Sequence, residues 1–290
     1  MDLLVEYEMN LTTASTLTII GVAGNAAIII VILRSKLLEN SFFRYMIAAS
    51  IFDILNVLLL WMSPVYEILN INRFSLNCKL NIYFNMLVSH LCPWMNVLSS
   101  IDRYLSVKYA TKFEIRKKFK YQFLAILFVC LIIGLIDTPF IFFVNVTTNG
   151  TLGSGCSTIN NHLAFLMAVL EALMSFTLPC ILMILSACVI GYELIILKKR
   201  TMNKKDFVKE KRMLKTLLSM NLFFFVTYSP YSFMLLAYSV LNKNYFGTLA
   251  YYIVRVLYRV YSASTIFVFL ASNILFRQNF ISMINCFKKK

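Results

Sequence analysis

Charged side chains inside long apolar stretches are the residues of this chain that could do chemistry. Asp53 lies deep in one stretch, and Asp102 and Arg103 stand side by side near the end of another. Ionisable groups in such surroundings are costly and mark binding or switching sites. Arg255 and Arg259 are four residues apart, which places them on one face of a helix, where a guanidinium could bind a carboxylate or a phosphate.

The sequence contains no motif that indicates catalysis or metal binding. We find no nucleophile paired with a base, no glycine-rich phosphate loop and no Cys-x-x-Cys pair, and His90 and His162 stand alone. Metal sites and nucleophilic catalysis need clusters of such groups. We therefore expect no enzyme, no cofactor and no metal site.

The composition argues against a water-soluble enzyme. Of 290 residues, 60% are hydrophobic and 14% are charged, with a mean hydropathy of +0.74. Soluble domains are closer to half apolar and a quarter charged. The net charge of +15 raises the question of nucleic acid, which the position of the basic residues must decide.

Apolar stretches long enough to cross a bilayer make up most of the chain. A helix needs roughly 20 apolar residues for this. We predict seven spans, at 15–33, 42–66, 78–107, 122–144, 163–197, 207–241 and 246–274, and a short amphipathic surface helix at 275–287. The expected fold is an all-α membrane protein, a seven-transmembrane helix bundle forming one domain over 1–290.

The basic residues gather on alternate connections between these spans. Segments 34–44, 103–120, 198–215 and the part after 274 hold 23 of the 28 Lys and Arg, and 121–197 holds none. Positive residues stay in the cytosol. We therefore expect a multi-pass plasma-membrane protein with an extracellular N-terminus and a cytosolic C-terminus. The basic charge then reflects topology and contact with membrane lipids, and it implies no nucleic acid.

Three Asn-X-Ser/Thr triplets occur, at Asn10, Asn145 and Asn149. All three fall on the expected extracellular side, so we predict glycosylation of at least one. Chance occurrence is the alternative, because the chain is rich in Asn.

A series of short motifs follows the spans in order. They are Gly24-Asn25, Asp53, Cys78, Asp102-Arg103-Tyr104, Pro179, Pro230 and Phe276-Arg277. In this order and spacing, the chain resembles the rhodopsin-like (class A) G-protein-coupled receptors through most of its length. Its overall character is also similar to that of invertebrate neuropeptide receptors, including the FMRFamide type.

The resemblance implies a switch at the cytosolic ends of two helices. Arg103 lies 25 residues after Cys78, about 38 Å at 1.5 Å per residue, and Glu210 lies 20 residues before Pro230, about 30 Å. Both therefore reach the inner face. We expect Asp102 to pair with Arg103, and Arg103 to reach Glu210, in a closed state whose opening admits a heterotrimeric G protein. The alternative is that Arg103 only marks the cytosolic side.

The cysteines suggest a disulfide and a lipid modification. Cys78 and Cys156 lie on the extracellular side, where oxidation is permitted, and we predict a disulfide between them. Cys286 ends the surface helix, which makes palmitoylation plausible. The remaining cysteines are expected to act as small apolar residues.

Asp53 and Asn25 match the positions with which the family holds water and sodium. Cys92 and Thr265 replace the usual serine and asparagine of that site. We therefore favour a hydrogen-bond network around Asp53 over a sodium site.

The outer half of the bundle would hold the ligand. The polar residues that we place in this pocket are Asn85, Glu171, Tyr228, Tyr231, Arg255, Arg259 and Glu67. The acids and arginines either pair with one another or open to clamp a charged ligand, and Asp137 is the only other acid available. Asn85 stands where amine receptors carry Asp, and Arg259 stands where opsins carry Lys, so amines and retinal are disfavoured. We expect a peptide. A small anion, a lipid, or a transporter or channel role are the alternatives.

Four positions depart from the family pattern. The fourth helix lacks its tryptophan, and Tyr228 and Ala187 stand where the family has tryptophan and tyrosine. Thr265–Phe269 replaces the Asn-Pro-x-x-Tyr motif of the seventh helix. We expect these changes to make coupling weak, constitutive or absent.

Overall fold

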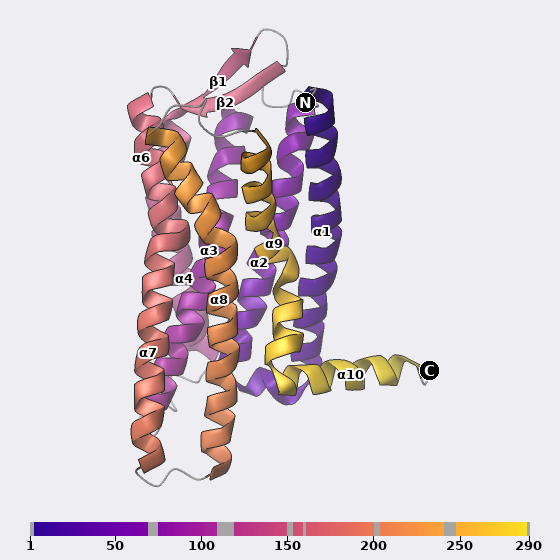
Figure 1. The fold of residues 1–290 in the computed structure, drawn as a ribbon, viewed down its shortest axis with the longest axis vertical. Coiled ribbons are helices and arrows are strands. Elements are labelled where there is room, and N and C mark those ends of the chain that lie inside the picture. Colours follow the sequence, from indigo (N-terminus) through magenta and orange to yellow (C-terminus); the bar gives the residue numbers. More distant parts are fainter. Residues whose placement is uncertain are drawn as a thin grey trace.

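The structure, a computed structural model, describes residues 3–68, 75–108, 119–149, 153–158, 161–199, 204–240 and 248–288. Long helices run side by side along one axis (Figure 1). They are α1 (Leu3–Arg34), α2 (Ser41–Ile68), α3 (Ser75–Lys108), α4 (Phe119–Ile136), α6 (Asn161–Ala172) with α7 (Leu178–Lys199), α8 (Lys204–Val240) and α9 (Thr248–Ser272). Shorter elements are η1 (Lys36–Glu39), α5 (Pro139–Phe142), the π-turn η3 (Leu173–Thr177) and α10 (Ile274–Lys288).

Six segments in the described part of the chain are long and apolar enough to cross a membrane. They are Leu11–Arg34, Ser41–Met62, Phe119–Phe142, His162–Ile196, Glu210–Ala237 and Tyr252–Ser272. Their exposed surface is rich in large apolar side chains, as on α4, where Leu124, Phe128, Leu131 and Leu135 are exposed. Such a surface needs a lipid environment.

Helix α3 is the long helix that is not apolar enough to join these six. Its polar side chains point into the bundle instead; those that are buried are Ser89, His90, Asn96, Ser99, Ser100, Asp102 and Arg103. It packs against α2, α4, α7 and α8. The helix predicted at 78–107 therefore exists and is enclosed by its neighbours, and its crossing of the membrane stays a prediction.

Two boundaries differ from the sequence-based expectation. Helix α1 begins at Leu3 rather than near residue 15, because the intervening residues include good helix formers such as Leu and Glu. The run predicted at 122–144 breaks after Ile136, since Pro139 lacks an N–H and starts the separate helix α5.

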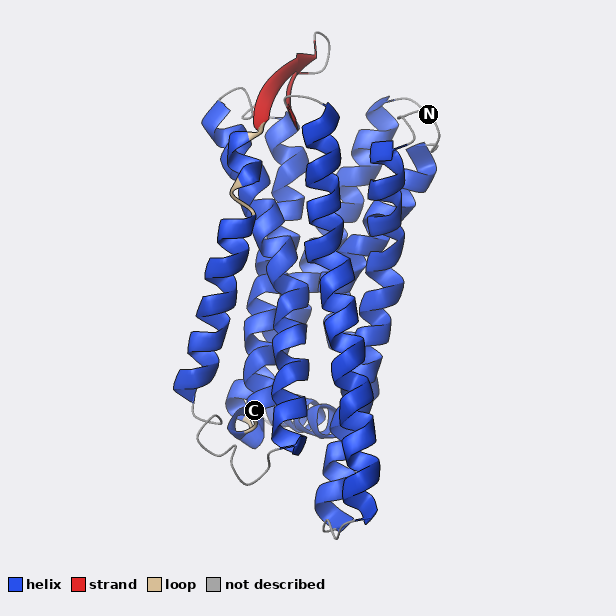
Figure 2. Ribbon diagram, turned by 90° about the vertical axis from the view of Figure 1, so that its left-hand side faces the viewer, coloured by secondary structure: helices blue, strands red, loops and turns tan. Residues whose placement is uncertain are grey.

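A β-hairpin corrects the all-α expectation. Strands β1 (Val144–Asn149) and β2 (Gly153–Thr158) are antiparallel, with Val146 opposite Cys156. The hairpin lies at one end of the bundle together with the start of α1, whereas α10 lies across the other end (Figures 1 and 2). The hairpin end and the α10 end therefore define the two faces of the bundle.

Candidate functional site

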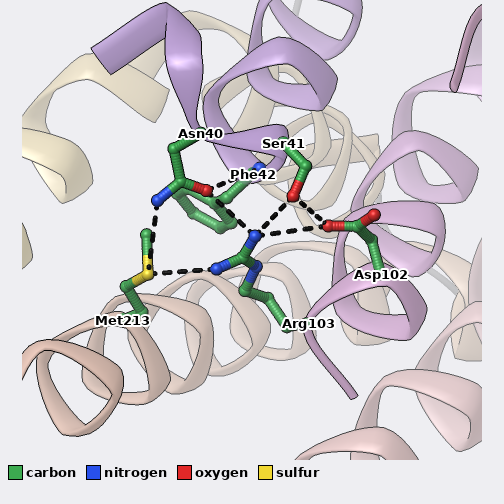
Figure 3. A network of polar contacts seen from close by, with 6 residues as sticks. All are labelled: Asn40, Ser41, Phe42, Asp102, Arg103 and Met213. Atoms are coloured by element: carbon green, nitrogen blue, oxygen red, sulfur yellow. Dashed lines mark hydrogen bonds and ion pairs between the residues drawn. The ribbon is translucent and has the colours of Figure 1, made fainter. Parts of the chain in front are cut away.

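Arg103 is buried near the end of α3, at the α10 end of the bundle. Its Nη2 donates hydrogen bonds to Asn40 Oδ1 (2.9 Å), Ser41 Oγ (2.5 Å) and Asp102 Oδ2 (3.3 Å). Its Nη1 donates to the thioether of Met213 on α8, at 3.2 Å (Figure 3). One guanidinium thus connects α3 to the start of α2 and to α8. We call these five residues the Arg103 network.

The start of α2 positions two of the partners. Asn40 caps this helix, because its Oδ1 also accepts the backbone N–H of Phe42 at 3.1 Å. Ser41 donates to Asp102 Oδ2 at 2.5 Å, so Ser41, Asp102 and Arg103 form a closed triangle of polar contacts. The ring of Phe42 lies 6.0 Å from the guanidinium carbon, at the limit of a cation–π contact.

The predicted contact between Arg103 and Glu210 is wrong for this conformation. Asp102 is the only acid paired with Arg103 among the described residues, and Met213 is the α8 residue that reaches the guanidinium. Glu210 and Met213 are three positions apart, so the observed partner lies almost one turn of α8 further along than the expected one. Tyr104 lies outside the network, because its hydroxyl accepts a hydrogen bond from Lys108 at 2.8 Å.

A second polar layer surrounds Asp53 in the middle of the bundle. Thr265 Oγ1 donates to Asp53 Oδ2 at 3.3 Å. Asn25 Nδ2 donates to the carbonyl oxygens of Gly21 (2.9 Å) and Ser262 (2.8 Å). Ser262 Oγ accepts from Asn56, whose Oδ1 accepts from Ser89. This layer joins α1, α2, α3 and α9.

Asn25 and Asp53 each keep one buried side-chain oxygen without a hydrogen-bond partner in the described part of the chain. Such oxygens suit a bridging water or a cation. No group of three or more His, Cys, Asp or Glu side chains that could hold a metal occurs among the described residues. The favoured hydrogen-bond network is thus present at Asp53 through Thr265, and sodium there stays the untested alternative.

A third layer lies toward the hairpin end, around Glu171. Tyr231 donates its hydroxyl to Glu171 Oε1 at 2.9 Å, and the ring of Tyr231 packs 4.6 Å from that of Tyr258. Arg255 and His90 are close enough to act electrostatically on Glu171. Of the pocket residues predicted from sequence, Tyr231 therefore contacts Glu171, and Arg255 lies within electrostatic range of it.

His90 and Asp137 form a buried pair that the sequence analysis missed. Both side chains are fully buried, and His90 Nδ1 lies 2.9 and 3.1 Å from the two carboxylate oxygens of Asp137. His90 was expected to stand alone, and Asp137 was considered only as a possible partner of an arginine. The acid at the break before Pro139 was the available signal, because a buried carboxylate there needs a partner.

Two other predicted pocket residues form no hydrogen bond or ion pair with Glu171 in the described part of the chain, although Tyr228 packs on Tyr258. Tyr228 is fully buried among the rings of Phe224, Tyr258 and Tyr261, so it does not line an open pocket. Asn85 donates to Asn81 on its own helix, at 2.8 and 2.7 Å.

The two arginines of α9 have different surroundings. Arg259 is buried and lines a narrow cavity with side chains of α1 and α2, among them Thr18 and Trp61, whereas Arg255 lies near Glu171. The side chain of Glu67 lies outside the described residues.

Modification sites are only partly described. Asn145 is exposed on β1, and Cys78 is fully buried at the hairpin end of α3. The side chains of Asn10, Asn149, Cys156 and Cys286 lie outside the described residues, although Asn10 falls within α1 and Cys156 within β2.

Comparison with known families decides the class of the protein. The model of the 7 transmembrane receptor (rhodopsin family) matches residues 24–269, which run from Gly24 of α1 to Phe269 near the end of α9. The chain belongs to this family of receptors. The receptor is accordingly a multi-pass membrane protein and not an enzyme. No curated protein matches the chain.

The receptor fills the place of the missing Asn-Pro-x-x-Tyr motif with aromatic packing. Phe269 is fully buried, with its ring 6.3 Å from Phe42 and 5.4 Å from Phe276. Phe42 in turn lies against Arg103. This part of α9 therefore supports the Arg103 network through ring contacts, and Thr265 keeps a polar link to Asp53.

We predict that Asp137→Asn lowers the stability of the receptor by about 1–3 kcal/mol, because the amide keeps one oxygen for His90 but replaces the other carboxylate oxygen, and the negative charge, with an NH2 group. The thermal unfolding midpoint of purified protein in detergent measures this. Asn145→Gln, at an exposed position, is the control. An Asp137→Asn midpoint equal to that of the control would show that the pair with His90 does not stabilise the bundle.

Proposed function

We propose that the chain is a plasma-membrane receptor that binds an extracellular ligand and activates a heterotrimeric G protein by opening its cytosolic face. The observation that carries this proposal is the Arg103 network, in which one buried arginine connects α8 to α2 and α3. The match to the receptor family supports both partners. The hairpin end is extracellular in this proposal, and the α10 end is cytosolic.

Activation is a shift between closed and open populations. A ligand that binds the open state more tightly than the closed state moves the equilibrium by that difference in affinity. In the closed state Arg103 is held by three oxygen acceptors on α2 and α3 but by a single thioether on α8. Because a thioether is a weak acceptor, the contact with α8 breaks most easily.

The weak contact at Met213 predicts measurable activity without ligand. Met213→Leu keeps the buried volume and removes the acceptor. A typical hydrogen bond contributes about 0.5–1.5 kcal/mol, and the thioether is a weak acceptor for the guanidinium, so ligand-free nucleotide exchange on a purified G protein should rise about two- to tenfold. Met220→Leu, a buried methionine of the same helix, is the matched control. Equal exchange by both variants would remove Met213 from the switch.

The ligand we favour is a peptide with a positively charged group. Glu171 is held by the Tyr231 hydroxyl, which an ammonium or guanidinium of the ligand would replace. The ring of Tyr231 packs at a tilt against Tyr258 and offers an aromatic wall beside the acid. Arg255, near Glu171, is the group that would favour a small anion instead.

Glu171→Gln tests this ligand class. We expect at least a tenfold loss of agonist potency, about 1.4 kcal/mol, because the amide cannot neutralise a cation. Concentration–response curves with agonists from a peptide library give the measurement, and Glu193→Gln on α7 is the control. Unchanged potency excludes Glu171 from the site, and improved potency indicates an anionic ligand.

Three modifications belong to the same proposal. A Cys78–Cys156 disulfide would tie the hairpin to α3; β2 contacts α3, and the free cysteines among the described residues are Cys92, Cys130, Cys180 and Cys188. Glycosylation is best supported at Asn145, which is exposed on the extracellular hairpin. Palmitoylation at Cys286, near the end of α10, would fasten this helix to the bilayer.

A further inference from the structure

A cavity of about 240 Å³ opens beside the Arg103 network, between α8 and the junction of α9 and α10. Its walls from α8 include Val208, Arg212, Met213 and Thr216, and Ile274 and Leu275 close the opposite side. This volume is close to the lower end of the roughly 300–1,000 Å³ typical of small-molecule pockets. It exceeds what a few bridging waters need.

The chemistry of the cavity is amphipathic and positively charged. Val208, Met213, Ile274 and Leu275 make most of its wall apolar, and Arg212 supplies a cationic group that is exposed at the mouth. Of the described residues that line it, none is acidic. An anion with an apolar body fits these walls, because an arginine binds a phosphate through two parallel hydrogen bonds.

The place of the cavity indicates where this anion comes from. Helix α10 leaves the bundle sideways at this point (Figure 1). Ile281 and Ile284 of that helix are exposed, as are Ile274 and Leu275 at the cavity. Such apolar side chains would face the hydrocarbon of the cytosolic leaflet, so an acyl chain can run from the bilayer to the cavity mouth.

We propose that this cavity binds the phosphate headgroup of an anionic phospholipid from the cytosolic leaflet, with the phosphate on Arg212 and the start of an acyl chain against Val208, Ile274 and Leu275. The orientation of the bundle in this statement rests on the proposed function. The small volume favours a compact headgroup such as that of phosphatidic acid.

The lipid stabilises the closed receptor. Met213 lines the cavity and also accepts the hydrogen bond from Arg103. A lipid that contacts both α8 and the α9–α10 junction loses its contacts with α8 when that helix moves away. It therefore binds the closed state better and shifts the population toward it.

Thermal unfolding of the full receptor in nanodiscs tests the proposal without any G protein, so its failure is distinct from a failure of coupling. Nanodiscs of phosphatidylcholine alone are compared with nanodiscs that contain one tenth phosphatidic acid. A bound lipid raises the unfolding midpoint by mass action. We expect this rise in the wild type and in Lys215→Gln, whose exposed lysine lies outside the cavity lining.

Two variants should lose at least about half of the rise: Arg212→Gln, which removes the charge, and Val208→Phe, which fills the mouth from an exposed position. No rise in the wild type, or an undiminished rise in Arg212→Gln, overturns the proposal. An equal loss in Arg212→Gln and Lys215→Gln overturns it too, because it shows a general effect of surface charge. A matching rise produced by inorganic phosphate in phosphatidylcholine nanodiscs overturns the lipid as the source.

Discussion

Polar side chains inside a bundle surrounded by lipid must find their partners within the protein, and most of this structure follows from that constraint. Helix α3 carries the largest share of them, and it is enclosed by its neighbours rather than exposed to the apolar surroundings. Three of these groups bond to neighbouring elements: His90 to Asp137, Asn96 to Tyr261, and Arg103 to residues of α2 and α8. His90 holds the break between α4 and α5 through Asp137, and Arg103 holds α2 and α8. The packing of the bundle and its candidate switch are therefore built from the same contacts.

Aromatic rings connect the layers along the inside of the bundle. From Tyr231 beside Glu171, ring contacts of 4.6, 4.8 and 5.0 Å lead through Tyr258 and Tyr228 to Tyr261. Asn96 of α3 donates a hydrogen bond to the hydroxyl of Tyr261 at 2.5 Å. This route occupies the region where the family carries its sixth-helix tryptophan. These continuous contacts connect the candidate ligand pocket to α3.

Hydropathy predicts the helices because a helix that crosses hydrocarbon needs a long run of apolar residues, and motif spacing then gives the order of the helices. They place Asp102 and Arg103 together near the end of α3, where the structure shows them paired. They do not give the depth or rotation of one helix relative to another, and Met213 rather than Glu210 reaches Arg103 for this reason.

The contacts and strands formed by residues between the predicted helices were harder to predict. Asn40 and Ser41 are short polar residues just before an apolar run, which is an ordinary helix-start signal, and nothing in that signal indicates a contact with Arg103. The hairpin was missed because its residues, rich in Thr, Ser and Gly, read as a loop.

The most direct test of this account is the separation between α8 and α10 beside the Arg103 network. Spin labels introduced at the exposed positions Lys211 and Arg277 report it by pulsed electron paramagnetic resonance. We predict one short distance population for the receptor alone and a second, longer population when nucleotide-free G protein is bound, since α8 must leave Arg103. An unchanged distance distribution, under conditions where the receptor catalyses nucleotide exchange, would contradict the account.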